Sequence, residues 1–196
     1  MNRLINQQVL IYGGNFNPPT LAHQAIISAC LKLPGFSEIW AMPSGERTDK
    51  HHDSDSQTRL EMLKLVKHQV FKNNPRLRIT DFELRLPTPT QTSRTIGALI
   101  CQYPSVDFWY VFGVDSYNSM PTWEDGDRLQ AELNMVIIKR GDGKLPERNG
   151  IRTIETKASS DISSTAVRES AKAGRSLDGL VSPAIKRYIE KHRLYL

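Results

Sequence analysis

The sequence of 196 residues predicts an α/β fold with a doubly wound parallel sheet, on the basis of two observations. Short and nearly continuous apolar segments alternate with longer segments of helical periodicity, as is typical of parallel strands covered by helices on both faces. A glycine-rich turn directly follows the first apolar segment, at the strand end where doubly wound sheets bind ligands. Six strands are expected, the last of them less apolar than the others: 8–12, 38–42, 77–80, 107–112, 133–139 and 152–156.

Helices are expected between these strands. The first opens near Thr20 and runs past Cys30, and the last carries Ser182 as its N-cap and Pro183 as its first residue. Ile185, Tyr188 and Ile189 are expected on the inner face of that last helix. The other expected helices span 57–71, 93–102 and 163–173.

The chain is expected to form one domain, 1–196, with a small C-terminal helical part from about residue 157. The polar stretch 140–149, rich in glycine and charge, is a weak boundary that leaves too few residues for a second domain.

Composition narrows the class of protein. The net charge is +5 with the basic residues scattered, which suits an anionic ligand but gives no dense basic stripe for a nucleic acid. No apolar run approaches the about 20 residues that cross a bilayer, and the N-terminus lacks a secretory h-region. Cys30 and Cys101 fall in different predicted helices, which indicates free thiols in a reducing, cytoplasmic setting.

The segment 12–23, Tyr-Gly-Gly-Asn-Phe-Asn-Pro-Pro-Thr-Leu-Ala-His, predicts a phosphate site. Gly13 and Gly14 allow unusual backbone conformations and close approach of a ligand. The helix that follows presents free N–H groups and a partial positive charge, and Thr20 and His23 lie one turn apart on it, leaning toward the same anion. The alternative is an ordinary strand-to-helix turn with a structural histidine, since neither the P-loop nor the dinucleotide spacing is present.

A second cluster lies at 161–168, Asp-Ile-Ser-Ser-Thr-Ala-Val-Arg. Hydroxyl groups at the start of a helix either cap it or donate to a phosphate. Arg168 shares a helix face with Ser164 and Thr165, so its guanidinium is placed to clamp triphosphate oxygens. A plain capped helix with a surface arginine is the alternative.

Both segments resemble motifs of the nucleotidyltransferase superfamily. The stretch 14–18, Gly-Asn-Phe-Asn-Pro, resembles G-[TS]-F-[DN]-P, and 162–168 resembles the I-S-S-T-x-x-R motif of the nicotinate/nicotinamide mononucleotide adenylyltransferases. The second motif follows the first by about 140 residues, as in that family. The resemblance implies a Rossmann-like nucleotidyltransferase fold and adenylyl transfer from ATP to a pyridine mononucleotide in NAD biosynthesis.

Further matches extend along the chain. Asp115, in Gly-Val-Asp-Ser, and Trp123 resemble the family's G-x-D-[AS] segment and downstream tryptophan, which implies a ribose contact and a stacking face for the pyridine. Residues 90–95 resemble the S-Y-T-x-D-T stretch, where a threonine and backbone groups meet the pyridine substituent. Lys50 falls in a basic loop that resembles the segment after the second strand. The C-terminal segment 180–195 resembles the family's last helix.

The chain departs from the family pattern at five positions. Thr20 stands where many bacterial members carry a histidine, Ala22 replaces a glycine, and Asn15 replaces Thr or Ser. Gln91 replaces an aromatic residue and Arg94 replaces an acidic one. These two changes leave open whether the substrate is nicotinate or nicotinamide mononucleotide. Arg94 either favours a carboxylate or points to solvent.

The implied roles divide into three groups. The catalytic residues are His23, Thr20 and Arg168; the ATP-binding residues are Gly13, Gly14, Asn15, Phe16, Ser164, Thr165 and Asp115; and the mononucleotide-binding residues are Thr92, Trp123, Lys50 and Asn17. Mg²⁺ is expected to accompany ATP without a dedicated protein site, because substrate phosphates supply most of its ligands. The adjacent His51, His52 and Asp53 are not expected to converge on an ion.

The expected partners are ATP and a pyridine mononucleotide, with no nucleic acid or membrane, and the sequence leaves a homo-oligomer open. Two other functions stay in view: a different small-molecule nucleotidyltransferase, such as one resembling pantetheine-phosphate adenylyltransferases, and a nucleotide-binding regulator without catalysis.

Overall fold

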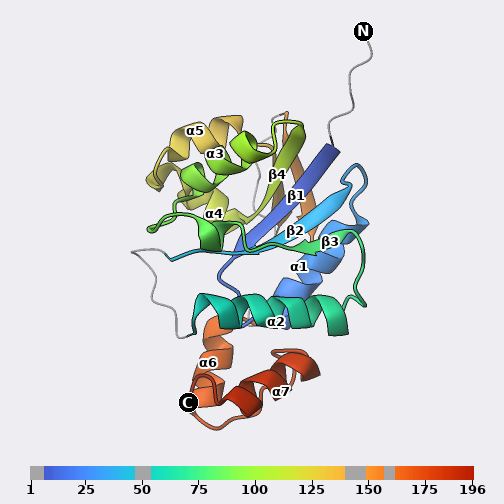
Figure 1. Ribbon diagram of the computed structural model, residues 1–196, viewed down its shortest axis with the longest axis vertical. Coiled ribbons are helices and arrows are strands. Elements are labelled where there is room, and N and C mark those ends of the chain that lie inside the picture. The colour runs from blue at the N-terminus through green and yellow to red at the C-terminus, as the bar shows by residue number, and fades with distance from the viewer. Residues whose placement is uncertain (1–6, 47–53, 140–148, 157–161) are drawn as a thin grey trace.

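A computed structural model of the protein describes residues 7–46, 54–139, 149–156 and 162–196. The described residues form a six-stranded sheet in the order β3-β2-β1-β4-β5-β6, with every neighbouring pair parallel (Figure 1). The strands are β1 (Gln7–Gly14), β2 (Glu38–Pro43), β3 (Leu77–Ile79), β4 (Val106–Gly113), β5 (Met135–Lys139) and β6 (Ile151–Glu155). The predicted doubly wound parallel sheet is confirmed.

The helices are α1 (Leu21–Lys32), α2 (Ser56–Gln69), α3 (Thr92–Gln102), α4 (Val114–Ser119), α5 (Gly126–Glu132), α6 (Ser164–Lys172) and α7 (Pro183–His192), with short 3₁₀ turns η1 (Glu83–Arg85) and η2 (Met120–Thr122). The sequence did not predict α4 and α5, which are too short for apolar periodicity to be visible. The strand expected at 133–139 begins two residues later, at Met135, and residues 133 and 134 lie in the loop before it.

The strand order reverses beside β1. This strand pairs with β2 on one side and with β4 on the other, with Leu10 opposite Ile39 and Trp109. The carboxyl ends of β1 and β4 therefore mark the point where the chain winds away in both directions, which is where such sheets bind ligands.

Alternate residues of each strand pack into two separate hydrophobic cores, one on each face of the sheet. Leu10 and Tyr12 of β1 pack with apolar residues of α1, whereas Val9 and Ile11 pack with residues of α3 and α5 on the other face of the sheet. Both layers are visible in Figure 1, where α3, α4 and α5 lie together on one side. Burial on both faces explains the nearly continuous apolar strands.

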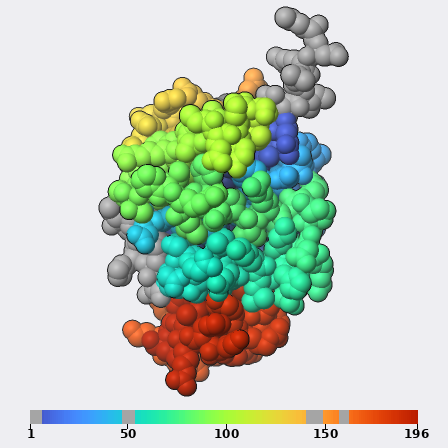
Figure 2. Space-filling view, in the orientation of Figure 1, coloured from blue at the N-terminus to red at the C-terminus, as the bar shows by residue number. Residues whose placement is uncertain are grey.

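The C-terminal helices form a third cluster against α2. Met62 and Val66 of α2 pack with Val167 of α6 and with Ile185 and Ile189 of α7. In Figure 2 the C-terminal residues accordingly cover the end of the molecule next to α2. The prediction that Ile185 and Ile189 face inward is confirmed, whereas Tyr188 lies at the edge of this cluster and donates from its hydroxyl to Glu61 Oε2 at 2.7 Å.

Both cysteines are free thiols, in α1 and α3 as expected. Among the described residues, no helix is long and apolar enough to cross a membrane.

Cys30 and Cys101 should differ sharply in reactivity. Cys30 has no exposed surface, and burial raises the pKa of its thiol to about 12, so almost none of it is thiolate at pH 8, whereas Cys101 is exposed. We expect iodoacetamide at pH 8 to alkylate Cys101 in the native protein and Cys30 only after denaturation, as read by peptide mass spectrometry. Rapid native labelling of Cys30 would contradict this packing.

Candidate active site

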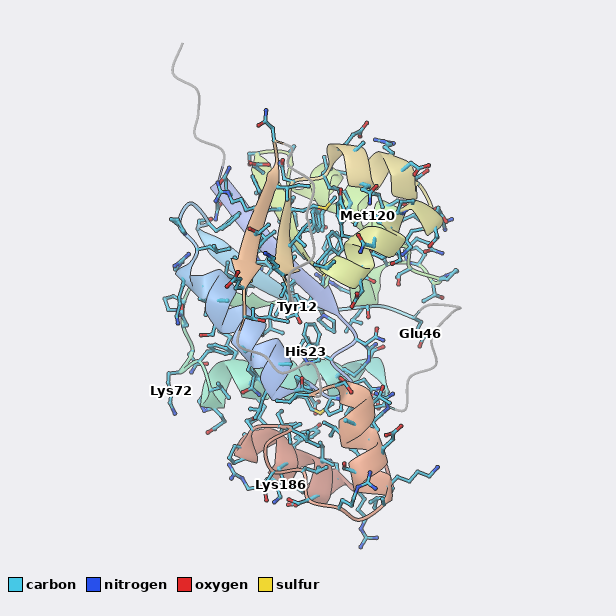
Figure 3. All side chains as sticks on the ribbon, turned by 180° about the vertical axis from the view of Figure 1, so that it is seen from behind. Tyr12, His23, Glu46, Lys72, Met120 and Lys186 are labelled. Carbon is cyan, nitrogen blue, oxygen red and sulfur yellow. The ribbon has the colours of Figure 1, made fainter. Side chains whose placement is uncertain are left out.

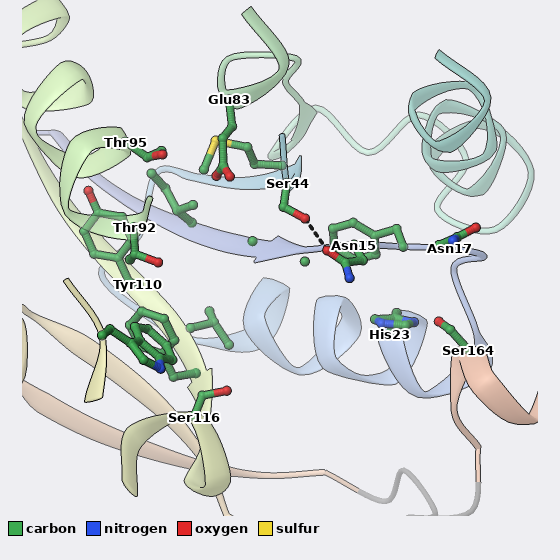
Figure 4. Close-up of a pocket in the computed structure, with 18 of the residues that line it drawn as sticks. Asn15, Asn17, His23, Ser44, Glu83, Thr92, Thr95, Tyr110, Ser116 and Ser164 are labelled. Atoms are coloured by element: carbon green, nitrogen blue, oxygen red, sulfur yellow. Dashed lines mark hydrogen bonds between the residues drawn. The ribbon is translucent and has the colours of Figure 1, made fainter. Parts of the chain in front are cut away.

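A cleft of about 390 Å³ opens beyond the carboxyl ends of β1 and β4. Figure 4 shows its two ends: His23 and Ser164 lie at one, and Tyr110, Thr92 and Ser116 at the other. The remaining lining residues are Ile11, Gly13, Gly14, Asn15, Phe16, Asn17, Met42, Ser44, Glu83, Thr95, Ile96, Val111, Phe112, Trp123, Thr165 and Arg168.

Of the two properties predicted for the glycine pair, the structure uses the free space and not the unusual backbone conformations. Gly13 and Gly14 continue β1, and neither has a positive φ angle, so the unusual backbone conformations expected of them are not used. A Cβ atom at Gly13 would meet no other atom within 4 Å, and at Gly14 it would lie 3.4 Å from the Phe16 ring. Because both glycines line the cleft, their missing side chains leave room for a ligand beside the backbone.

Phe16 is the residue that takes the left-handed conformation, with a φ of 49°. Such a conformation is costly for a bulky residue and persists only where packing holds it. The Phe16 ring is fully buried, 5.4 Å from the Tyr12 ring and 5.1 Å from the His23 imidazole, centre to centre. Figure 3 shows Tyr12 and His23 close together at the end of β1. The buried phenylalanine therefore sets the course of the turn toward α1.

Thr20 and His23 form a capping box at the start of α1. The Thr20 N–H donates to His23 Nδ1 at 2.9 Å, and the His23 N–H donates to Thr20 Oγ1 at 3.4 Å. Since Nδ1 accepts a hydrogen bond, the proton of the neutral ring is assigned to Nε2. Thr20 is fully buried and does not line the cleft, and its hydroxyl caps the helix, so a contact of both side chains with one anion stays a prediction.

The second motif, at the start of α6, lies against the turn that the first motif forms. Arg168 Nη1 donates to the Asn17 carbonyl oxygen at 2.9 Å, and Nη2 donates to Thr165 Oγ1 at 3.3 Å. The Ser164 hydroxyl donates to the Pro18 carbonyl oxygen at 2.8 Å, so this hydroxyl holds the turn. Ser163 caps α6 by accepting the Ala166 N–H. Ser164, Thr165 and Arg168 all line the cleft.

Three residues that the sequence did not single out as site residues hold the turn from behind. Arg59 of α2 has no exposed surface and donates from Nη1 to the Asn15 carbonyl oxygen at 3.0 Å. Burial lowers the pKa of Arg59, opposed by the negative charge of Glu83. Ser54 and Tyr195 both donate to Asn17 Oδ1, at 2.6 and 2.7 Å. Asn17, predicted to bind the mononucleotide, lines the cleft with its side-chain oxygen already engaged.

The opposite end of the cleft is aromatic. Trp123 lines it and packs edge-on against Phe112, with ring centres 5.9 Å apart. Thr92, the first residue of α3, lines it as expected. Asp115 is exposed in the first turn of α4 and does not line the cleft, whereas its neighbour Ser116 does.

Some predicted residues lie elsewhere. Lys50, Arg47 and 51–53 fall outside the described residues. Arg94 does not line the cleft; it forms an ion pair with Glu124 at the surface, so the prediction that it contacts a substrate carboxylate finds no support in its position.

The chain belongs to the cytidylyltransferase-like family, whose model matches residues 11–170. It is therefore a nucleotidyltransferase. A nicotinate-nucleotide adenylyltransferase of Bacillus subtilis is 29% identical over 191 residues, covering 96% of this chain and 98% of that protein. The fold is shared with a Plasmodium falciparum nicotinic acid mononucleotide adenylyltransferase complexed with NaAD, at a TM-score of 0.82 and 24% identity over 96% of this chain and 97% of that one.

Tyr110 offers a test of the cleft wall. Its hydroxyl is buried without a hydrogen-bond partner among the described residues, and burial holds its pKa well above the ordinary value. A buried hydroxyl without a partner costs roughly 1–3 kcal/mol. We expect Tyr110→Phe to leave the free energy of unfolding unchanged or higher by about 1 kcal/mol. Urea denaturation measures this, and a loss of stability would show that the hydroxyl has a partner.

Proposed function

We propose that this protein transfers the AMP moiety of ATP to nicotinate mononucleotide, forming the dinucleotide and releasing pyrophosphate, as a step of NAD biosynthesis. The observation that carries the proposal is the two-ended cleft. His23, Thr165 and Arg168 line the cleft beside the start of two helices, and Trp123, packed against Phe112, lines the same cleft. The name of the Bacillus subtilis relative supports nicotinate as the pyridine.

The reaction needs positioning more than acid–base chemistry. The phosphate of the mononucleotide is already an anionic nucleophile, so it can attack the α-phosphorus of ATP in line while the bond to pyrophosphate breaks. Negative charge then grows on the phosphate oxygens. Donors fixed in advance stabilise that charge without having to reorganise.

We assign these donors to the two motifs. The Nε2–H of His23 would donate to an oxygen of the transferring phosphate, and Arg168 and Thr165 would hold the β and γ phosphates. The partial positive charges at the starts of α1 and α6 act in the same direction. Thr20 contributes indirectly, because its N–H fixes the His23 ring. At the other end, Trp123 would stack on the pyridine and Thr92 would meet its carboxylate, with Asp115 and Lys50 proposed as outer contacts.

A divalent metal accompanies ATP in nucleotidyltransferases, and we propose Mg²⁺. Among the described residues, no three His, Cys, Asp or Glu side chains cluster as a metal site. Mg²⁺ is commonly held mainly by phosphate oxygens, so we propose that the triphosphate supplies most of its ligands. When bound, Mg²⁺ would neutralise charge on the triphosphate, and the hydroxyl groups of Ser164 and Thr165 are neutral oxygen-bearing groups in the cleft wall. A cytoplasmic location, no nucleic-acid partner and an open oligomeric state stay predictions.

The other candidate acceptors gain little from the structure. Thr20 was the feature that favoured a pantetheine-phosphate acceptor, but it caps α1 and does not line the cleft. Trp123 in the cleft wall suits a flat ring.

The proposed activity is tested with purified protein, ATP, Mg²⁺ and each pyridine mononucleotide. We expect pyrophosphate release and dinucleotide formation, with kcat/KM higher for nicotinate than for nicotinamide mononucleotide. If neither mononucleotide gives product, the proposed function is wrong.

The role of His23 is tested by His23→Ala. Loss of one donor to developing charge lowers kcat by about 10²–10³-fold in comparable sites. His68→Ala is the matched control, because His68 is exposed on α2 and contacts Asn73 rather than the cleft. An unchanged kcat in His23→Ala would contradict the assignment.

A further inference from the structure

The two walls at the pyridine end of the cleft come from separate parts of the chain. One wall is the start of α3, where Thr92, Thr95 and Ile96 line the cleft. The other includes Trp123, in the turn between η2 and α5. What joins these two walls decides how firmly a ring could be held between them.

The turn is rigid on its inner side. The Trp123 N–H donates to the Met120 carbonyl oxygen at 2.9 Å, and the Gly126 N–H donates to the Trp123 carbonyl oxygen at 3.0 Å. Met120 is fully buried, and a Cβ atom on Gly126 would lie only 1.9 Å from the Met120 oxygen. Any side chain at position 126 would therefore push the turn away from the buried Met120.

The tip of the turn is fastened to α3 by a two-pronged ion pair. Arg94 Nε donates to Glu124 Oε1 at 3.0 Å, and Arg94 Nη2 donates to Oε2 at 3.3 Å. Glu124 directly follows Trp123, and Asp125 then takes a left-handed conformation with a φ of 57°. Within the part of the chain that the structure describes, no other hydrogen bond or ion pair joins α3 to residues 120–126.

We propose that the Arg94–Glu124 pair is a clasp that positions Trp123 for the pyridine ring of the mononucleotide. The pair joins the start of α3 to the turn that carries Trp123, next to the tryptophan in sequence and two residues from Thr92. An arginine–carboxylate fork fixes orientation as well as distance, which a single contact would not. This inference rests on the proposed function, since it names the pyridine nucleotide as the molecule that occupies this end.

The ion pair with Glu124 also explains why Arg94 is not assigned to bind the substrate carboxylate. Arg94 does not line the cleft, and its Nε and Nη2 donate to Glu124 and not to a group inside the cleft. Arg94 and Glu124 are therefore positioning residues, acting through Trp123, and neither is a catalytic residue.

The expected effect is modest and confined to one substrate. The Arg94 and Glu124 side chains are 63% and 40% exposed, and exposed pairs of good geometry contribute little beyond a factor of about five. We expect Arg94→Ala to raise KM for the mononucleotide about 3–5-fold, with kcat and KM for ATP within about twofold of the parent protein. Arg94→Glu, which places two negative charges next to each other, should raise KM for the mononucleotide further.

Charge exchange separates the clasp from a general structural role. The double variant Arg94→Glu with Glu124→Arg should bring KM for the mononucleotide back to within about twofold of the parent protein. The control is Arg128→Ala, because Arg128 and Glu132 form an ion pair of the same 3.0 Å length, and more exposed, on α5 away from the cleft wall. That variant should change neither KM.

The clasp can be tested even if the proposed reaction fails. Trp40 and Trp109 are buried, so acrylamide quenching reports mainly on Trp123, and Trp123→Phe identifies its share. Arg94→Ala should increase quenching in the absence of any nucleotide, and the exchanged pair should reverse it. Unchanged quenching and unchanged KM in Arg94→Ala, or failure of the exchange to restore them, would overturn the clasp; absence of product in the parent protein alone would overturn only the proposed function.

Discussion

The rest of the site depends on one set of interactions, the hydrogen bonds that fix the carbonyl oxygens of the turn between β1 and α1. Three of these oxygens accept hydrogen bonds from distant side chains, at Asn15 from Arg59, at Asn17 from Arg168 and at Pro18 from Ser164. These hydrogen bonds give each oxygen a donor and fix the turn. The same contacts bring α2 and α6 to the turn, so the cleft wall is assembled from segments far apart in the sequence.

The two ends of the cleft differ in the chemical groups that line them. The end near α1 and α6 offers donors to anions, and it relies on a histidine kept in one tautomer by the N–H of Thr20. The other end offers aromatic surface with a few hydroxyl groups. A pyridine mononucleotide has the same division, with an anionic phosphate at one end and a flat ring at the other. The order of the two ends supports transfer between bound substrates in one cleft.

Local patterns predicted the strands, the first turn and the longer helices, because apolar periodicity acts over a few positions. Ser182 precedes α7 as predicted, but its hydroxyl makes no capping hydrogen bond among the described residues. Two details differ from these patterns: the Thr20 hydroxyl caps α1, and the glycine pair leaves the expected space beside the cleft without the expected unusual φ angles. Arg59, Ser54 and Tyr195 could not be assigned from sequence, since their partners in the turn lie 37 or more residues away. The partner of Arg94, 30 residues further along, was hidden for the same reason.

A crystal structure of the protein with Mg²⁺ and a non-hydrolysable ATP analogue tests the central claim most directly. The claim is that the two motifs form opposite sides of one triphosphate site. We predict the α-phosphate within hydrogen-bond distance of His23 Nε2 and the β and γ phosphates against Thr165 and Arg168, with the turn carbonyls still bonded as they are here. A triphosphate bound away from either motif, or a turn that releases Arg168 to open the cleft, would contradict it.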